Sequence, residues 1–212
     1  MYKEGKTTEA LRLFELGMEK NPALVDNYYY AGLCELSRHH YQRGYDHMQH
    51  ILTSFPDQVR KTVYLFAAIA AKHTQQLGKA LSLTTSGIGK HPEYIDLYQY
   101  RAKLNQQQEK WQEAHEDYEI VLKQRKNNPE VLLGAALCAK HLGFGSNCMS
   151  LLNAALYADH SHEFTSSILL ERIKINYQEG KVKECSKDLK KLSEVEPDGC
   201  DFNYFKGLLQ LK

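Results

Sequence analysis

Two stretches of this sequence contain residues whose types and spacing could support chemistry. The first, residues 86–91, is similar to a phosphate-binding loop because Gly89 and Lys90 stand at the spacing of that motif. Thr84 replaces its first glycine, however, and His91 replaces the hydroxyl residue that would bind magnesium. The stretch also ends a helical pattern and follows no strand. We predict that it closes a helix and binds no nucleotide.

The second stretch is a histidine cluster that could bind a metal. His47 and His50 are three residues apart on a predicted helix, which places both rings on one face. No carboxylate or cysteine stands beside them at ligand spacing, so we predict that His39, His40, His47 and His50 are exposed and hold no metal. No nucleophile, base and orienting residue can be assembled either. We therefore expect no enzyme activity, no catalytic residue and no cofactor.

Composition and charge exclude several classes of partner. The 212 residues are 42% hydrophobic and 25% charged, which is typical of a folded globular chain. Lysine and arginine number 27 against 26 aspartates and glutamates, so the net charge of +1 provides no general attraction to nucleic acid or anionic membranes. The longest apolar runs, 63–71 and 131–139, are far shorter than the roughly 20 residues of a membrane-spanning helix. We expect neither a nucleic-acid partner nor a membrane span.

The start of the chain and its cysteines indicate an intracellular protein. The first six residues contain no apolar segment of a secretory signal. The five cysteines are odd in number and form no Cys-x-x-Cys pair, which argues against a disulfide framework and a structural zinc site. We expect a cytoplasmic location, with the cysteines serving as small buried hydrophobic residues.

The pattern that must position any functional residue is a helical hairpin, seen most clearly between residues 25 and 58. Two apolar series with helical spacing follow one another there. Small residues stand where the two helices have to cross closely, and a proline ends the second helix. The first series is Tyr28, Ala31, Gly32 and Glu35; the second is Tyr41, Gly44, Met48 and Ile51, closed by Pro56.

The hairpin pattern recurs along the whole chain. Prolines 22, 56, 92, 129 and 197 are separated by 34, 36, 37 and 68 residues, the last being twice 34. With these prolines as boundaries, we predict a half repeat over 1–24, repeats over about 25–58, 59–94, 95–131, 132–165 and 166–199, and a half repeat over 200–212. Glu163 stands where one proline is expected, so the boundary near it is the least regular.

These offsets resemble the tetratricopeptide repeat, and the resemblance covers essentially the whole chain. It implies an all-α fold, a right-handed superhelix of stacked helical hairpins (an α-solenoid) that forms a single array over residues 1–212. Pentatricopeptide arrays that bind RNA are related, but their period is longer and their surfaces are basic, whereas this chain is balanced in charge. RNA binding is therefore the lowest of our alternatives.

The resemblance also implies a binding face. In tetratricopeptide arrays, positions 2, 5, 9 and 12 of each first helix line a concave groove that binds peptides. We predict an apolar floor in the second and third repeats and, at position 9 of the next three, a row of lysines for an acidic partner. The alternative is three solvated lysines. The predicted groove residues are Tyr29, Leu33, Leu36, Leu65, Ile69, Lys103, Lys140 and Lys174.

The functional prediction is a non-catalytic scaffold that binds protein or peptide partners within a larger assembly. One alternative is the targeting or regulatory arm of an enzyme whose catalytic domain lies outside this chain. The carboxylate clamp of chaperone-binding relatives is absent, because Tyr29 and Leu33 stand where it needs lysine and asparagine. We also expect exposed apolar ends, covered by further repeats or partner subunits: Leu11, Phe14 and Leu16 at one, and Phe202, Phe205, Leu208 and Leu209 at the other.

Overall fold

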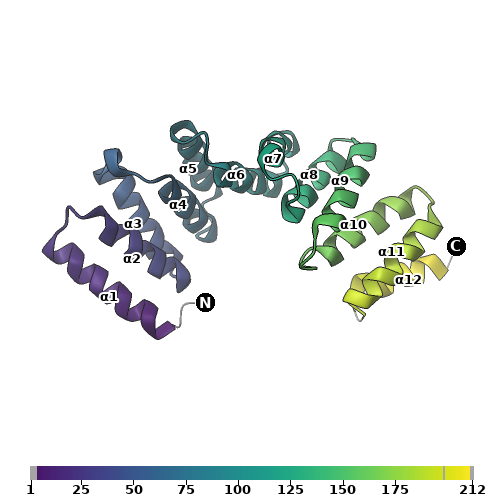
Figure 1. The fold of residues 1–212 in the computed structure, drawn as a ribbon, viewed down its shortest axis with the longest axis horizontal. Coiled ribbons are helices and arrows are strands. Elements are labelled where there is room, and N and C mark those ends of the chain that lie inside the picture. Colours follow the sequence, from purple (N-terminus) through teal and green to yellow (C-terminus); the bar gives the residue numbers. More distant parts are fainter. Residues whose placement is uncertain (1–3, 198, 211–212) are drawn as a thin grey trace. The chain divides into compact units, whose positions relative to one another are not determined.

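The computed structural model describes residues 4–197 and 199–210, and this part of the chain is α-helical with one short 3-10 helix and no strand. The predicted all-α class is confirmed. The helices are joined by short turns (Figure 1). Their bounds are α1 (Glu4–Lys20), α2 (Val25–Ser37), α3 (Tyr41–Ser54), η1 (Pro56–Gln58), α4 (Lys61–His73), α5 (Leu77–Lys90), α6 (Ile95–Gln107), α7 (Trp111–Gln124), α8 (Pro129–His141), α9 (Gly145–Ala158), α10 (Thr165–Gln178), α11 (Val182–Val195) and α12 (Cys200–Gln210).

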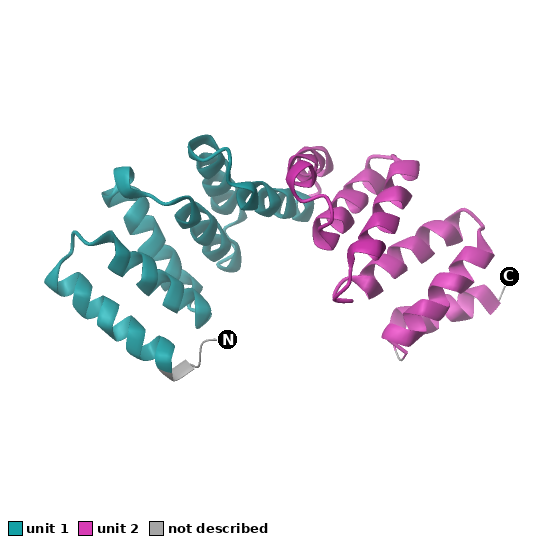
Figure 2. Ribbon diagram, viewed as in Figure 1, with its two compact units in different colours: residues 1–108 teal, residues 109–212 magenta. Residues whose placement is uncertain are grey.

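The chain divides into two compact units, residues 1–108 and 109–212, coloured separately in Figure 2. In the first, each helix from α1 to α6 packs against the next, and α4 also contacts both α2 and α6. The buried side chains of Met48, Ile51 and Val63 form the centre of its core. Leu11 is 5% exposed and packs inward, whereas Leu16 is 44% exposed. The predicted exposure of the first helix is thus correct for Leu16 and wrong for Leu11.

In the second unit, each helix from α7 to α12 packs against the next. Leu152 and Ile168 belong to one core cluster, and Leu169, Leu192 and Phe205 belong to another. Phe205 on α12 was predicted to be exposed, but it is buried because α12 turns this side of the helix onto α11.

The same turn joins the first and second helices of every hairpin. One residue adopts a left-handed backbone conformation, and in four of the turns the next N–H donates to the carbonyl five residues earlier, as in a Schellman motif. The left-handed residues of these five turns are His39 (φ 62°), Gln75 (φ 61°), Glu109 (φ 57°), Gly143 (φ 80°) and Gly180 (φ 71°). Only two of these five are glycines.

The left-handed residue stands at a constant distance from the helix start in four of the five hairpins, and this corrects one predicted boundary. Helices α2, α4 and α6 begin 14 residues before it, and α8 likewise begins at Pro129, 14 residues before Gly143. We predicted that this helix starts near Leu132, because Pro129 was taken to close the preceding repeat. Proline is equally favoured at the first position of a helix, which is where Pro129 lies. Lys126 instead occupies the place that Pro56 and Pro92 take, two residues after the second helix ends.

The connection between α9 and α10 has no proline and is organised by a buried carboxylate. Asp159 is 3% exposed and its Oδ2 accepts hydrogen bonds from the Phe164 N–H (2.9 Å) and the Thr165 hydroxyl (2.7 Å). The Ser161 hydroxyl donates to Oδ1. Burial alone would raise the pKa of Asp159, but these hydrogen bonds outweigh it and lower the pKa below its ordinary value.

Exchanging residues at the left-handed turns should change stability in opposite directions. Gly143→Ala is expected to lower the free energy of unfolding by about 1 kcal/mol, because an added Cβ meets no atom within 4 Å and only the backbone conformation is penalised. Gln75→Gly should raise it by about 0.5 kcal/mol for the same reason. Urea denaturation measures both. Equal stabilities for Gly143→Ala and the native chain would contradict the left-handed conformation assigned to residue 143.

Removing the carboxylate of Asp159 should destabilise the second unit. Asp159→Ala leaves the Phe164 N–H and the Thr165 hydroxyl without their acceptor, and we expect a loss of about 2 kcal/mol at pH 7. Asp57→Ala, at an exposed aspartate, is the matched control and should change stability by under about 0.5 kcal/mol. Thermal denaturation of both variants provides the comparison. The role assigned to Asp159 is wrong if the two variants melt alike.

Candidate functional site

The predicted apolar residues of the first unit lie on two helices that contact each other, α2 and α4. Leu33, Leu36, Leu65 and Ile69 are all half-buried. Tyr29 is only 9% exposed, and its hydroxyl lies 2.9 Å from the Thr62 hydroxyl. Tyr29 is therefore mainly a core residue that ties α2 to α4, and the four aliphatic side chains form the more accessible part of this face.

In the second unit, Lys140 and Lys174 meet at one carboxylate that the sequence analysis did not single out. Lys140 Nζ lies 2.8 Å from Glu171 Oε2, and Lys174 Nζ lies 2.7 Å from Glu171 Oε1. The Glu171 side chain is 17% exposed. Burial would raise its pKa, but the hydrogen bonds and charges of the two lysines outweigh this and lower the pKa. Two ammonium groups against one carboxylate leave one positive charge in surplus.

The structure corrects the predicted row of three equivalent lysines. Lys103 and Lys174 stand six residues before the left-handed residue of their turns, but Lys140 stands three residues before Gly143. The place in α8 equivalent to Lys103 and Lys174 is taken by the apolar, half-buried Leu137. Lys103 is half-buried in α6, in the first unit, and takes part in interactions of its own. The structure brings together Lys140 and Lys174, through Glu171.

The histidine cluster is held by neighbours that sequence reasoning missed. His40 is exposed, as predicted, but the predicted lack of a carboxylate partner is wrong, because its Nδ1 lies 2.6 Å from Oε2 of Glu35, a residue only 1% exposed. The rings of His47 and His50 both pack near that of Tyr28, with centroids 6.5 and 4.5 Å from it. Burial lowers the pKa of His47. Among the described residues, no group of three His, Cys, Asp or Glu side chains could hold a metal ion.

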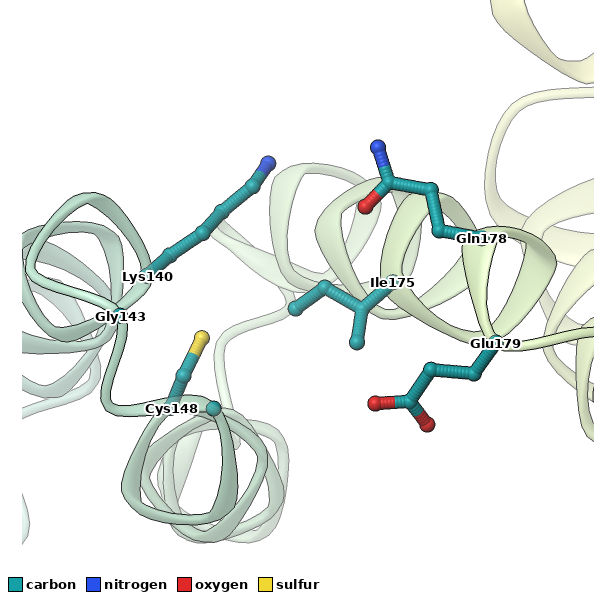
Figure 3. Close-up of a pocket in the computed structure, with 7 residues that line it drawn as sticks. Lys140, Gly143, Cys148, Ile175, Gln178 and Glu179 are labelled. Carbon is teal, nitrogen blue, oxygen red and sulfur yellow. The ribbon is translucent and has the colours of Figure 1, made fainter.

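A pocket opens in the second unit beside Lys140, between the turn from α8 to α9 and the end of α10 (Figure 3). Cys148 and Ile175 are its buried walls. Burial raises the pKa of the Cys148 thiol, which disfavours the thiolate that a nucleophile requires. The complete lining is Lys140, Gly143, Gly145, Cys148, Ile175, Gln178 and Glu179.

Within residues 4–197 and 199–210, no helix combines the length and the apolarity needed to cross a bilayer.

Comparisons with known proteins identify the fold. No family model and no curated protein matches the sequence. Among solved structures, YrrB, described as a TPR protein with an unusual peptide-binding site, matches with a TM-score of 0.76 and 15% identity over 92% of this chain and 97% of its own. PilF of Pseudomonas aeruginosa matches with a TM-score of 0.78 and 15% identity over 96% and 90%. A tetratricopeptide repeat protein from Parabacteroides merdae matches with a TM-score of 0.74 and 17% identity over 98% and 80%.

These identities establish the architecture alone. The chain has the tetratricopeptide repeat fold, as the spacing of its apolar and small residues predicted.

The pairing at Glu171 should produce a pH-dependent contribution to stability. Glu171→Gln is expected to lower the free energy of unfolding by about 2 kcal/mol at pH 7. A carboxyl whose folded pKa is lowered stabilises the protein above its unfolded pKa of about 4.3, and this contribution disappears as the pH falls through the folded pKa. The difference between variant and native chain should therefore shrink below about pH 4.

Glu194→Gln, at an exposed position of α11, is the control for this substitution. Urea denaturation at a series of pH values measures both variants. A Glu171→Gln effect that stays constant with pH would contradict the ion pairing.

Proposed function

We propose that this chain is a non-catalytic scaffold within a larger assembly. It binds segments of protein partners on the face of its first helices that carries the predicted groove residues. The observation that carries the proposal is the lysine pair on α8 and α10, which shares one carboxylate and retains a positive charge. The half-buried Leu33, Leu65 and Ile69 on α2 and α4 give the first helices of the other unit an apolar surface.

Apolar side chains of a partner would complement the surface of the first unit, and acidic side chains would complement the lysine pair of the second. Apolar side chains gain by leaving water against leucine and isoleucine, and a carboxylate is attracted to the surplus charge at Lys140 and Lys174. The peptide-binding site reported for YrrB supports this use of the fold. The net charge of +1 argues against a nucleic-acid partner, because such binding depends on many lysines and arginines facing phosphates.

Neutralising the lysine pair should remove the partner without unfolding the chain. In a pull-down from native lysate at about 0.1 M salt, we expect the double variant Lys140→Gln, Lys174→Gln to retain at most about one fifth of the acidic partner that the native chain retains. The double variant Lys140→Arg, Lys174→Arg keeps both charges and should retain the partner. Circular dichroism checks that each variant is folded.

The matched control is Lys183→Gln, Lys187→Gln, which removes two exposed charges from α11, a second helix. Identical sets of proteins captured by the folded glutamine variant at 140 and 174 and by this control would show that the lysine pair does not bind a partner, and would remove the observation on which the proposal rests.

A further inference from the structure

The pocket occupies a place that the chain fills with an aromatic side chain in two other repeats. Tyr41, the first residue of α3, stacks on His73, the last residue of α4, with ring centroids 4.0 Å apart and planes 6° apart. Trp111, the first residue of α7, stacks in the same way on His141, the last residue of α8, at 3.7 Å and 1°. An aromatic ring at the start of a second helix thus covers the end of the next first helix.

In the fifth repeat the corresponding residues are Gly145, the first of α9, and Gln178, the last of α10. Glycine provides no side chain to cover Gln178. A Cβ built at Gly145 meets no heavy atom within 4 Å, so the space beside it is open. Both residues line the pocket. The pocket therefore lies at the position where Tyr41 and Trp111 stack in other repeats, and here Gly145 provides no ring to fill it.

The walls of the pocket are suited to a flat ring. Figure 3 shows Lys140 and Cys148 on one side and Ile175, Gln178 and Glu179 on the other, with their side chains directed toward the space between them. Ile175 and Cys148 provide buried apolar and sulfur contacts. Gln178 is the last residue of its helix, as His73 and His141 are of theirs, so its planar amide takes the sequence position of the two stacking imidazoles. The ammonium group of Lys140 can face a ring, and the carboxylate of Glu179 can accept a hydrogen bond from an indole N–H or a phenol hydroxyl.

We propose that this pocket receives a tryptophan or tyrosine side chain of a protein partner. The occupant is chosen by the chain's own precedent: the aromatic residues Tyr41 and Trp111 fill two of the equivalent places, and the aliphatic Leu77, the first residue of α5, takes a third. That it comes from a protein rests on the proposed scaffold function. This pocket, called the ring pocket below, lies at the turn from α8 to α9 and the end of α10. It does not involve Lys174 or the apolar residues of α2 and α4.

The test separates ring binding from partner binding. The full chain, labelled with ¹⁵N, is titrated with N-acetyltryptophanamide and, as the aliphatic control, N-acetylleucinamide. We expect the tryptophan probe to shift the amide signals of residues 143–148 and 175–179 with a dissociation constant on the order of 1 mM, and the leucine probe to bind at least about tenfold more weakly.

Gly145→Trp should fill the pocket and weaken the tryptophan probe at least about tenfold, whereas Gly145→Ala should change its binding less than about twofold, because alanine leaves the space open. The amide spectrum shows whether each variant is folded. Absence of shifts at these residues, or equal binding to the native chain and to Gly145→Trp, overturns the proposal.

A pull-down with Gly145→Trp then tests the protein occupant. Loss of a partner that Gly145→Ala retains supports it. Retention of every partner by folded Gly145→Trp overturns the claim that a partner side chain occupies the pocket, even where the probe binds. If partners are lost on neutralising Lys140 and Lys174 but retained by Gly145→Trp, the scaffold function is supported and the ring pocket proposal is overturned.

Discussion

Each unit depends on the close crossing of the two helices in the hairpins that it contains. In the four hairpins that lie within one unit, the fourth residue of the second helix is small and buried: Gly44, Ala80, Cys148 and Cys185. A Cβ at Gly44 would lie 2.6 Å from the Leu36 side chain and 3.3 Å from the Gly32 carbonyl oxygen, so a larger residue would displace Leu36 and crowd the neighbouring helix.

Buried charges complete the hairpins where the apolar pattern is interrupted. Glu35 pairs with His40, and Asp188, 1% exposed, receives two hydrogen bonds from Arg172. Burying an ion pair adds little net stability, but removing one partner is costly because the other charge remains buried. Such pairs therefore tie particular helices together more than they raise overall stability. Glu171 likewise joins α8 to α10 through Lys140, and its pairing with two lysines leaves one positive charge in surplus.

The register of the repeats decides which residues stand at equivalent positions. Leu33 and Ile69 are equivalent, because each stands six residues before the left-handed residue of its turn, and Pro56 and Pro92 each follow the second helix by two residues. Lys140 was misplaced by three residues because a proline can either follow one helix or begin the next. The left-handed turn residue resolves this choice, but in three of five turns it is not glycine, so the sequence carries no clear mark of it.

The sequence by itself determined the helical hairpins, their approximate period and the absence of recognisable catalytic motifs, since these follow from local spacing of apolar, small and helix-ending residues. Only the tertiary structure decided that Glu171 joins two lysines and that Gly145 leaves a pocket open. Those facts depend on which residues of neighbouring repeats face each other. A single sequence does not encode that in any local pattern, because the contacts join residues about 30 positions apart whose distance is set by helix packing.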